Sequence, residues 1–109
     1  MKRGEIWTVA GGGGYANKPR PVAILQDHRF SHTRSITVCG FSSYSEEISL
    51  FRLLVRPTQA NGLRVPCRLM VDKIVTVPKS KLGTRIGRLS DVDIQRLNRA
   101  MVVFLGIAD

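Results

Sequence analysis

Short apolar stretches separated by polar turns run through most of the chain and predict β-strands. Residues 4–9, GEIWTV, alternate polar and apolar side chains with a period of two, as in a half-buried strand. Residues 20–26 form a continuous apolar run typical of a central strand, and residues 35–41 are rich in β-branched side chains. Further strands are expected at residues 48–55, 67–71, 73–77 and 84–89, and the two between residues 67 and 77 could be one bent strand.

The clearest helical pattern lies toward the C-terminus. Ser90 suits the N-cap, and Asp93 stands at the third helical position, where its carboxylate can reach back to the cap or favour the helix dipole. Apolar residues then recur every three or four positions: Ile94, Leu97, Met101 and Phe104 or Leu105. Gly106 is expected to end the helix.

Many short strands and one terminal helix predict a mainly β protein, a small antiparallel sheet forming a partly open barrel with a C-terminal α-helix. Strands and helices do not alternate, so a parallel nucleotide-binding sheet is not expected. Residues 1–109 contain no internal repeat and no linker, and they are expected to form a single domain. The glycines at 11–14 lack the motif of a phosphate-binding loop and lead into a strand, so a surface connection that could fold over a ligand fits them better.

Basic residues outnumber acidic ones and concentrate in one window. The net charge is +9, and residues 56–90 hold eight basic residues against Asp72 alone. The basic residues of this window are Arg56, Arg64, Arg68, Lys73, Lys79, Lys81, Arg85 and Arg88. The asymmetry favours an anionic partner, such as nucleic acid, an anionic surface or an acidic polypeptide, although a solubilising face would have the same composition.

The chain carries no sign of export or membrane insertion. No apolar run is long enough to span a membrane, and the first residues lack the pattern of a secretory signal. A cytoplasmic protein is therefore expected. In that setting Cys39 and Cys67 are expected to be buried thiols with a structural role, because their spacing matches no zinc motif.

Arg20 is the most constrained basic side chain of the sequence. Pro19 and Pro21 restrict the backbone on both sides of it, which would hold its guanidinium ready to meet a phosphate. The alternative is an ordinary surface arginine at the start of a strand. His28 and His32 share one turn and could act as an acid–base pair, or they could be exposed loop residues.

Three segments resemble the MazF/PemK toxins of bacterial toxin–antitoxin pairs: KRGEIW near the start, KPRPVAIL at the second strand, and NGLRVPCRLMVDKIVTVPKSKLGTRIGRLS. The resemblance covers nearly the whole chain and is weakest between residues 42 and 55. It implies an SH3-like barrel that forms a homodimer and acts as a metal-independent endoribonuclease on short sequences in single-stranded RNA. It also implies inhibition by a cognate MazE/PemI-like antitoxin whose flexible acidic tail fills the RNA groove.

The resemblance also implies site residues. The arginine of the family's RPV motif is Arg20, and the hydroxyl residue that ends the third strand is Ser42, or Ser43 if the alignment slips by one. Many members carry a glutamate five residues before the arginine; here that position is Tyr15, which suggests base stacking instead. We therefore expect Arg20 and Ser42 to be catalytic, with no cofactor and no metal. The residues expected to bind RNA are Tyr15, Lys18, Ser43, Arg56, Lys79 and Arg85.

The expected reaction uses the nucleophile that RNA itself supplies. The 2′-hydroxyl would attack the adjacent phosphorus, while Arg20 stabilises the charge on the phosphorane oxygens and Ser42 positions the phosphate. Two other classes stay open. One is a toxin like CcdB, which shares the fold and poisons DNA gyrase by binding it. The other is a non-catalytic RNA-binding barrel explained by charge alone.

Overall fold

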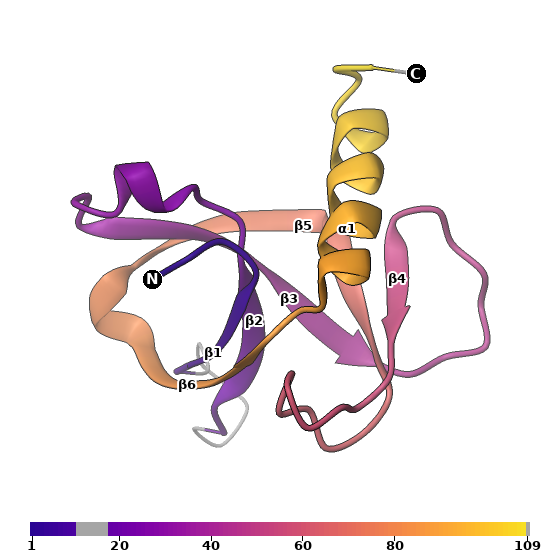
Figure 1. The fold of residues 1–109 in the computed structure, drawn as a ribbon, viewed down its shortest axis with the longest axis horizontal. Coiled ribbons are helices and arrows are strands. Elements are labelled where there is room, and N and C mark those ends of the chain that lie inside the picture. The colour runs from indigo at the N-terminus through magenta and orange to yellow at the C-terminus, as the bar shows by residue number, and fades with distance from the viewer. Residues whose placement is uncertain (11–17, 109) are drawn as a thin grey trace.

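A single antiparallel sheet dominates the computed structural model, which describes residues 1–10 and 18–108 (Figure 1). Within those residues the sheet has six strands in the order β4-β5-β3-β2-β1-β6, so its two edges, β4 and β6, do not pair and the barrel stays open. The strands are β1 (Glu5–Val9), β2 (Arg20–Ile24), β3 (Ser35–Ser43), β4 (Arg52–Val55), β5 (Cys67–Pro78) and β6 (Leu82–Arg88). The predicted mainly β fold with one C-terminal helix is confirmed.

The register of the central strands is set by their buried apolar residues. Val22 of β2 stands opposite Gly40 of β3, and beside this pair the buried Ala23 and Ile24 of β2 stand opposite the buried Cys39 and Val38 of β3. The segment from residue 67 to residue 77, for which one or two strands were possible, is one strand, because β5 pairs along its length with β3. A short 3-10 turn at Lys79–Lys81 joins β5 to β6, and another at His28–Phe30 lies between β2 and β3.

Several expected strand boundaries are wrong: β2 ends at Ile24 and not at residue 26, and β6 spans Leu82–Arg88 and not residues 84–89. The strand expected at residues 48–55 begins only at Arg52, where the guanidinium pairs with Asp72 of β5 at 2.9 Å. Ile48 is 97% exposed, so its apolar side chain is no sign of a buried strand. The third strand continues past Phe41 through Ser42 and Ser43, because both pair with the first residues of β5.

The connection between β4 and β5 lies against the outer edge of β6. The backbone N–H of Arg88 donates to the carbonyl of Ala60 at 3.0 Å, and the buried side chain of Asn61 bonds to backbone groups of the same connection. Gly62 has a φ of 69°, and a Cβ at this position would lie 2.0 Å from the carbonyl oxygen of Ile86. The turn at Asn61 and Gly62 therefore covers part of the open side of the barrel.

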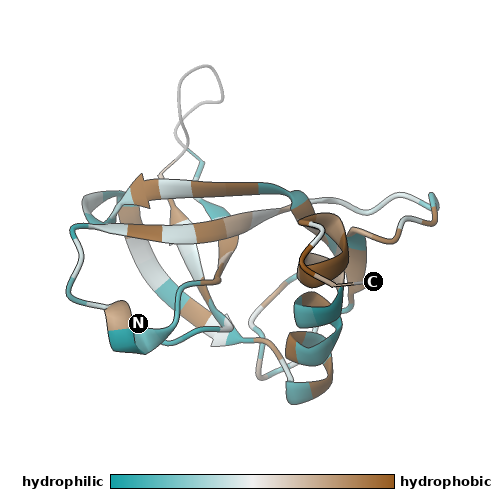
Figure 2. Cartoon of the chain, turned by 90° about the horizontal axis from the view of Figure 1, so that it is seen from above, coloured by the Kyte–Doolittle hydropathy of each residue, from teal (hydrophilic) through white to brown (hydrophobic). Residues whose placement is uncertain are grey.

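Helix α1 (Asp91–Phe104) packs on β5 and β4. As predicted, Ser90 caps it by accepting a hydrogen bond from the N–H of Asp93 at 3.1 Å. Leu97 is buried in the larger apolar cluster of the core, with Ile94 and Met101 packed against that cluster. The last turn of the helix is apolar yet exposed (Figure 2). Among the described residues no helix has the length and apolar character needed to cross a membrane.

Candidate active site

A cavity of about 580 Å³ opens where the ends of several strands meet. Its walls come from β1, β2, β3, β5 and β6 and from the connection that precedes β5. Three residues that the sequence analysis expects to act on RNA line it together: Arg20, Ser42 and Ser43. The antiparallel sheet thus gathers side chains from distant parts of the chain at one place.

Arg20 is the first residue of β2, and its backbone pairs with Val9 of β1. Pro19 and Pro21, which flank it, also line the cavity. Val22 of β2 stands opposite Gly40 of β3. Two residues further along the same antiparallel register, Arg20 lies level with Ser42. The guanidinium is exposed, and a rigid planar donor at this position can meet two oxygens of one phosphate.

Ser42 and Ser43 are the last residues of β3. The hydroxyl of Ser42 donates to the backbone carbonyl of Arg68 at 3.4 Å. This distance is well above the usual 2.7–2.8 Å between such oxygens, so the bond is weak and a phosphate oxygen can replace the carbonyl as acceptor. Ser43 is more exposed than Ser42 and lines the same cavity. Either serine can therefore supply an uncharged hydroxyl that donates a hydrogen bond to a phosphate oxygen.

Arg68 fixes the backbone on which this donor sits. Although charged, it is only 9% exposed. Its guanidinium donates to the carbonyl of Ser45 at 2.9 Å and to that of Arg52 at 3.0 Å, and it lies 5.8 Å from the centroid of the Tyr44 ring. One of the eight basic residues in the charged window is thus buried within the protein and adds little to the surface available to a partner.

The floor of the cavity is apolar. Phe41 and Leu63 are buried and belong to the core, and Cys67 beside them is a buried free thiol, as predicted. Burial raises the pKa of the Cys67 thiol to about 11 and that of Cys39 to about 12. Both remain protonated near neutral pH and are not nucleophiles.

Two polar residues of the cavity were not singled out as site residues from the sequence. Arg64 reaches it because the connection after Gly62 folds back over the strand ends. Thr8 reaches it from β1, where its hydroxyl accepts a hydrogen bond from the N–H of Thr84 at 2.9 Å. The pair Asn61-Gly62 is typical of a turn before Arg64, but sequence alone does not give the side of the sheet toward which the chain turns.

The other described residues expected to bind RNA do not line this cavity. Tyr15 lies outside the described residues, while Lys18, just before Pro19, is exposed. Arg56 begins the connection to β5, and its carbonyl accepts a hydrogen bond from Asn61 at 2.9 Å. The ammonium of Lys79 donates to the carbonyl of Ser31, and Arg85 pairs with Glu5 at 3.2 Å. Their roles stay predictions.

The described residues contain no group of three or more His, Cys, Asp or Glu side chains placed to hold a metal ion. His28 and His32 are both exposed and neither lines the cavity of Arg20. The described residues of the cavity offer the guanidinium groups of Arg20 and Arg64, neutral hydroxyls and an apolar floor, a combination that suits a phosphate attached to a flat base.

Comparisons with known proteins agree with this geometry. A family model described as PemK-like, MazF-like toxin of type II toxin–antitoxin systems matches residues 2–105. The chain is 49% identical to the probable endoribonuclease MazF of Mycolicibacterium smegmatis, with 99% of both proteins covered. It is 29% identical to the endoribonuclease MazF9 of Mycobacterium tuberculosis, with 98% of both covered. A solved endoribonuclease in complex with its cognate antitoxin, from a mycobacterial species, matches with a TM-score of 0.79 at 21% identity, covering 100% of this chain and 98% of that one.

The matches confirm the fold class and the endoribonuclease toxin predicted from the sequence, and they do not favour the gyrase-poisoning or the non-catalytic alternative. They do not test the roles of Arg20, Ser42 and the other site residues. The chain belongs to the PemK-like, MazF-like family of toxins of type II toxin–antitoxin systems.

Proposed function

We propose that this chain is a sequence-specific, metal-independent endoribonuclease that cuts single-stranded RNA, with Arg20 and Ser42 as its catalytic residues. The observation that carries the proposal is the cavity in which β2 and β3 bring these two side chains together. Residues 1–109 would act as one toxin domain in the cytoplasm, where RNA and an antitoxin both occur.

In the proposed reaction the 2′-oxygen forms a bond to the adjacent phosphorus and the bond from phosphorus to the 5′-oxygen breaks. The 2′-hydroxyl loses a proton and the departing 5′-oxygen gains one, so the products are a 2′,3′-cyclic phosphate and a 5′-hydroxyl. Arg20 stabilises the negative charge that develops on the phosphorane oxygens. Ser42 donates to a phosphate oxygen in place of the carbonyl of Arg68. The attacking group belongs to the RNA, so a metal-bound water is not required.

Specificity would come from the surroundings of the cavity. The apolar floor formed by Phe41 and Leu63 offers a surface against which a base can pack. Ser43 and Arg64 add polar groups at the rim. Tyr15 is placed by sequence five residues before Arg20, where it could stack on a neighbouring base. Lys18 and Arg56 would contact backbone phosphates nearby.

The partner proposed for the same cavity is a MazE/PemI-like antitoxin. The mycobacterial structure named above holds an endoribonuclease with its cognate antitoxin. A flexible acidic tail loses entropy when it binds, so it needs apolar anchors as well as charge. The Arg20 cavity offers both, since Arg20 and Arg64 supply positive charge and Val65 and Ile86 supply apolar surface. RNA and antitoxin should therefore exclude each other, which a competition titration with the antitoxin encoded beside this gene would test.

A second copy of the chain is the other partner proposed. Exposed apolar side chains occur in the segment before β4 and at the end of α1. They are Leu50, Phe51, Phe104, Leu105 and Ile107. The rings of Phe51 and Phe104 lie 5.3 Å apart and join the two segments. A contiguous apolar surface of this kind marks an interaction site. Phe104→Glu should give a smaller species in sedimentation velocity, whereas Val92→Glu in the first turn of α1 should not.

The experiment that tests the proposed function is incubation of the purified protein with a long mixed-sequence RNA in EDTA, followed by a denaturing gel and mapping of the cut ends. Discrete cuts at a shared short sequence would support it. A shift of the RNA on a native gel without cleavage would indicate the non-catalytic barrel. No effect on RNA, together with inhibition of DNA gyrase, would indicate a toxin of the other class.

A further inference from the structure

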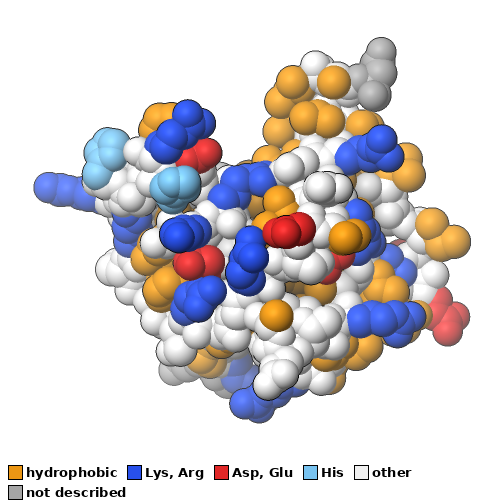
Figure 3. All heavy atoms as spheres, viewed as in Figure 1, with side chains coloured by type: hydrophobic (Ala, Val, Ile, Leu, Met, Phe, Trp, Pro, Cys, Tyr) orange, Lys and Arg blue, Asp and Glu red, His pale blue; other side chains and the backbone are white. Residues whose placement is uncertain are grey.

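A second cavity, of about 610 Å³, lies between the N-terminal residues and β6. It is lined by Lys2, Arg3, Glu5, His28, Arg85 and Arg88. Figure 3 shows this face of the molecule, where Lys and Arg side chains gather near the N-terminus with the histidines beside them. Of these six described residues, four carry a positive charge and one a negative charge, so the cavity presents an excess of positive charge to solvent.

The carboxylate of Glu5 is largely covered and already engaged. It accepts hydrogen bonds from the N–H of Lys2 and the indole of Trp7, both at 3.0 Å, and pairs with Arg85 at 3.2 Å. Burial alone would raise the pKa of Glu5, but these hydrogen bonds and the charge of Arg85 outweigh it and lower the pKa. Glu5 therefore holds the side chain of Arg85 and the backbone of Lys2 in place, and its single negative charge does not cancel the four positive charges of the cavity.

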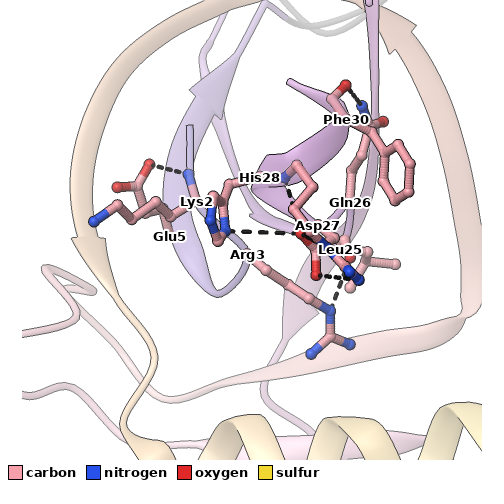
Figure 4. Close-up of polar contacts among 9 residues, drawn as sticks. Lys2, Arg3, Glu5, Leu25, Gln26, Asp27, His28 and Phe30 are labelled. Carbon is pink, nitrogen blue, oxygen red and sulfur yellow. Dashed lines mark hydrogen bonds and ion pairs between the residues drawn. The ribbon is translucent and has the colours of Figure 1, made fainter. Parts of the chain in front are cut away.

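Two further cations of this cavity, Arg3 and Arg88, contact other parts of the protein. Arg3 donates through Nε to the carbonyl of Leu25 at 2.8 Å (Figure 4), and through Nη2 to the sulfur of Met101 at 3.4 Å. Arg88 approaches Asp91 at 3.5 Å, in an exposed pair that is easily exchanged for another anion. Lys2 and His28 line the same cavity, and in Figure 4 the side chains of Lys2 and Arg3 extend in different directions. The result is a set of cations spread around one cavity, of which Arg3 and Arg85 are held by contacts of their side chains.

The lining distinguishes this cavity from that of Arg20. Among the described residues no apolar side chain lines it, whereas Phe41, Leu63 and Val65 line the other. A disordered acidic peptide needs apolar anchors to offset its ordering entropy, and the described lining of the second cavity provides none. A phosphodiester backbone needs only cations and donors at suitable positions. The chemistry of the lining therefore favours RNA phosphates over an acidic polypeptide.

We propose that the cavity lined by Lys2, Arg3, Arg85 and Arg88 binds phosphates of the substrate RNA that lie outside the segment held at Arg20; this rests on RNA being the substrate. β1 connects the two cavities, since Thr8 lines the first and Glu5 the second. Positions an odd number apart face opposite sides of a strand, so an RNA must extend around the β1–β6 edge to reach both. The second cavity thus adds affinity for long RNA without touching the scissile phosphate.

The test uses the full-length protein carrying Lys2→Gln and Arg88→Gln together, since both residues are exposed and neither holds a buried group. The matched control is Arg34→Gln with Arg99→Gln, which removes the same charge from exposed positions outside both cavities. Two RNAs of about 6 and about 16 nucleotides, within the range that one small barrel covers, share one cleavage sequence. Thermal unfolding confirms that both variants are folded.

For the long RNA we expect the KM of the cavity variant to rise roughly fivefold to tenfold, because two exposed ionic interactions with phosphate are removed. The log–log salt slope of its binding should become shallower by about 0.7 for each phosphate that the variant no longer neutralises. Cleavage of the short RNA, and all values for the control, should stay unchanged.

Equal losses on both RNAs, equal losses in the control variant, or weaker binding of the antitoxin with unchanged binding of long RNA would each overturn the proposal. If the unsubstituted protein cleaved neither RNA, the proposed function would fail, while the binding comparison would still decide whether the second cavity holds RNA.

Discussion

The two cavities of this protein share strand β1 and differ in what lines them. The first combines one constrained arginine, two serines and an apolar floor of core residues. Of the described residues, only charged and polar ones line the second, arranged around the carboxylate of Glu5. Charge stabilisation is most effective where donors are fixed beside an apolar surface that keeps water away, and the first cavity offers both. The second is suited to binding, because its cations are spread out and largely open to solvent.

The two cavities use positive charge for different purposes, the first for catalysis and the second for binding, whereas the sequence shows only one basic window. The basic window from residue 56 to residue 90 places Arg64 at the first cavity, Arg85 and Arg88 at the second, and Arg68 inside the protein. The net charge of the window therefore overstates the charge that any single partner meets. Substitutions that assign an effect to one cavity and not the other can test the distinction.

The largest effect is expected at Arg20. Arg20→Ala should lower the rate of RNA cleavage by ~10²–10³, because it removes a fixed donor to the transition state. The protein should stay folded, since Arg20 is an exposed residue at the start of β2. Single-turnover kinetics with a short RNA would measure the loss, with circular dichroism as the control for folding. Near-normal turnover would show that the first cavity is not the catalytic one.

The floor of the first cavity can be tested through its thiol. Burial raises the pKa of Cys67 to about 11, so alkylation by iodoacetamide near pH 8 should be roughly a hundredfold slower than for an ordinary exposed thiol. The labelling rate should rise as the pH approaches 11, because only the thiolate reacts. The same protein in guanidinium chloride is the control. Rapid labelling of folded protein at pH 8 would mean that the floor is open to water.

Ser42→Ala should lower the cleavage rate by roughly tenfold to a hundredfold, less than Arg20→Ala, because it removes a neutral donor. Ser43→Ala is the matched comparison, since both serines line the first cavity. Rates of the two variants on one RNA decide between them. A loss at Ser43→Ala with none at Ser42→Ala would assign the hydroxyl to the neighbouring position.

The smallest effect is expected at the histidines. His28→Ala and His32→Ala should each retain most activity on a short RNA, because the mechanism assigns them no proton and neither lines the first cavity. The pH–rate profile should therefore show no limb near ~6.5, the usual pKa of histidine. A large loss of rate at either residue with RNA binding intact would point to acid–base catalysis by histidine.

Much of the fold followed from local pattern. The helix was predicted from Ser90 and the spacing of Ile94, Leu97 and Met101, and each of these does what the pattern requires. The boundaries of β3 and β4 were missed because pairing with β5 decides them. Ile48 is apolar but lies outside β4 and is exposed. The strand predicted from the apolar residues at 48–55 was therefore longer than the observed β4.

The candidate site was predictable only where a short motif or a resemblance marked it. Arg20 stood out through its two prolines, and Ser42 through the family resemblance. Arg64 and Thr8 join them only because the connection after Gly62 folds over the strand ends. The second cavity could not be predicted, because it joins the N-terminus to β6 through Glu5, and contacts between residues so far apart are set by the tertiary fold.

The most direct test of the central claim replaces the 2′-hydroxyl at the cleavage position. A short RNA cut by the protein in EDTA is compared with the same strand carrying a single 2′-deoxynucleotide at the mapped site. The account predicts that the substituted strand binds with similar affinity and is not cut there, while the unsubstituted strand yields a 2′,3′-cyclic phosphate and a 5′-hydroxyl. Cleavage of the deoxy-substituted strand at the same position would contradict it, because the nucleophile would then have to come from the protein or from water.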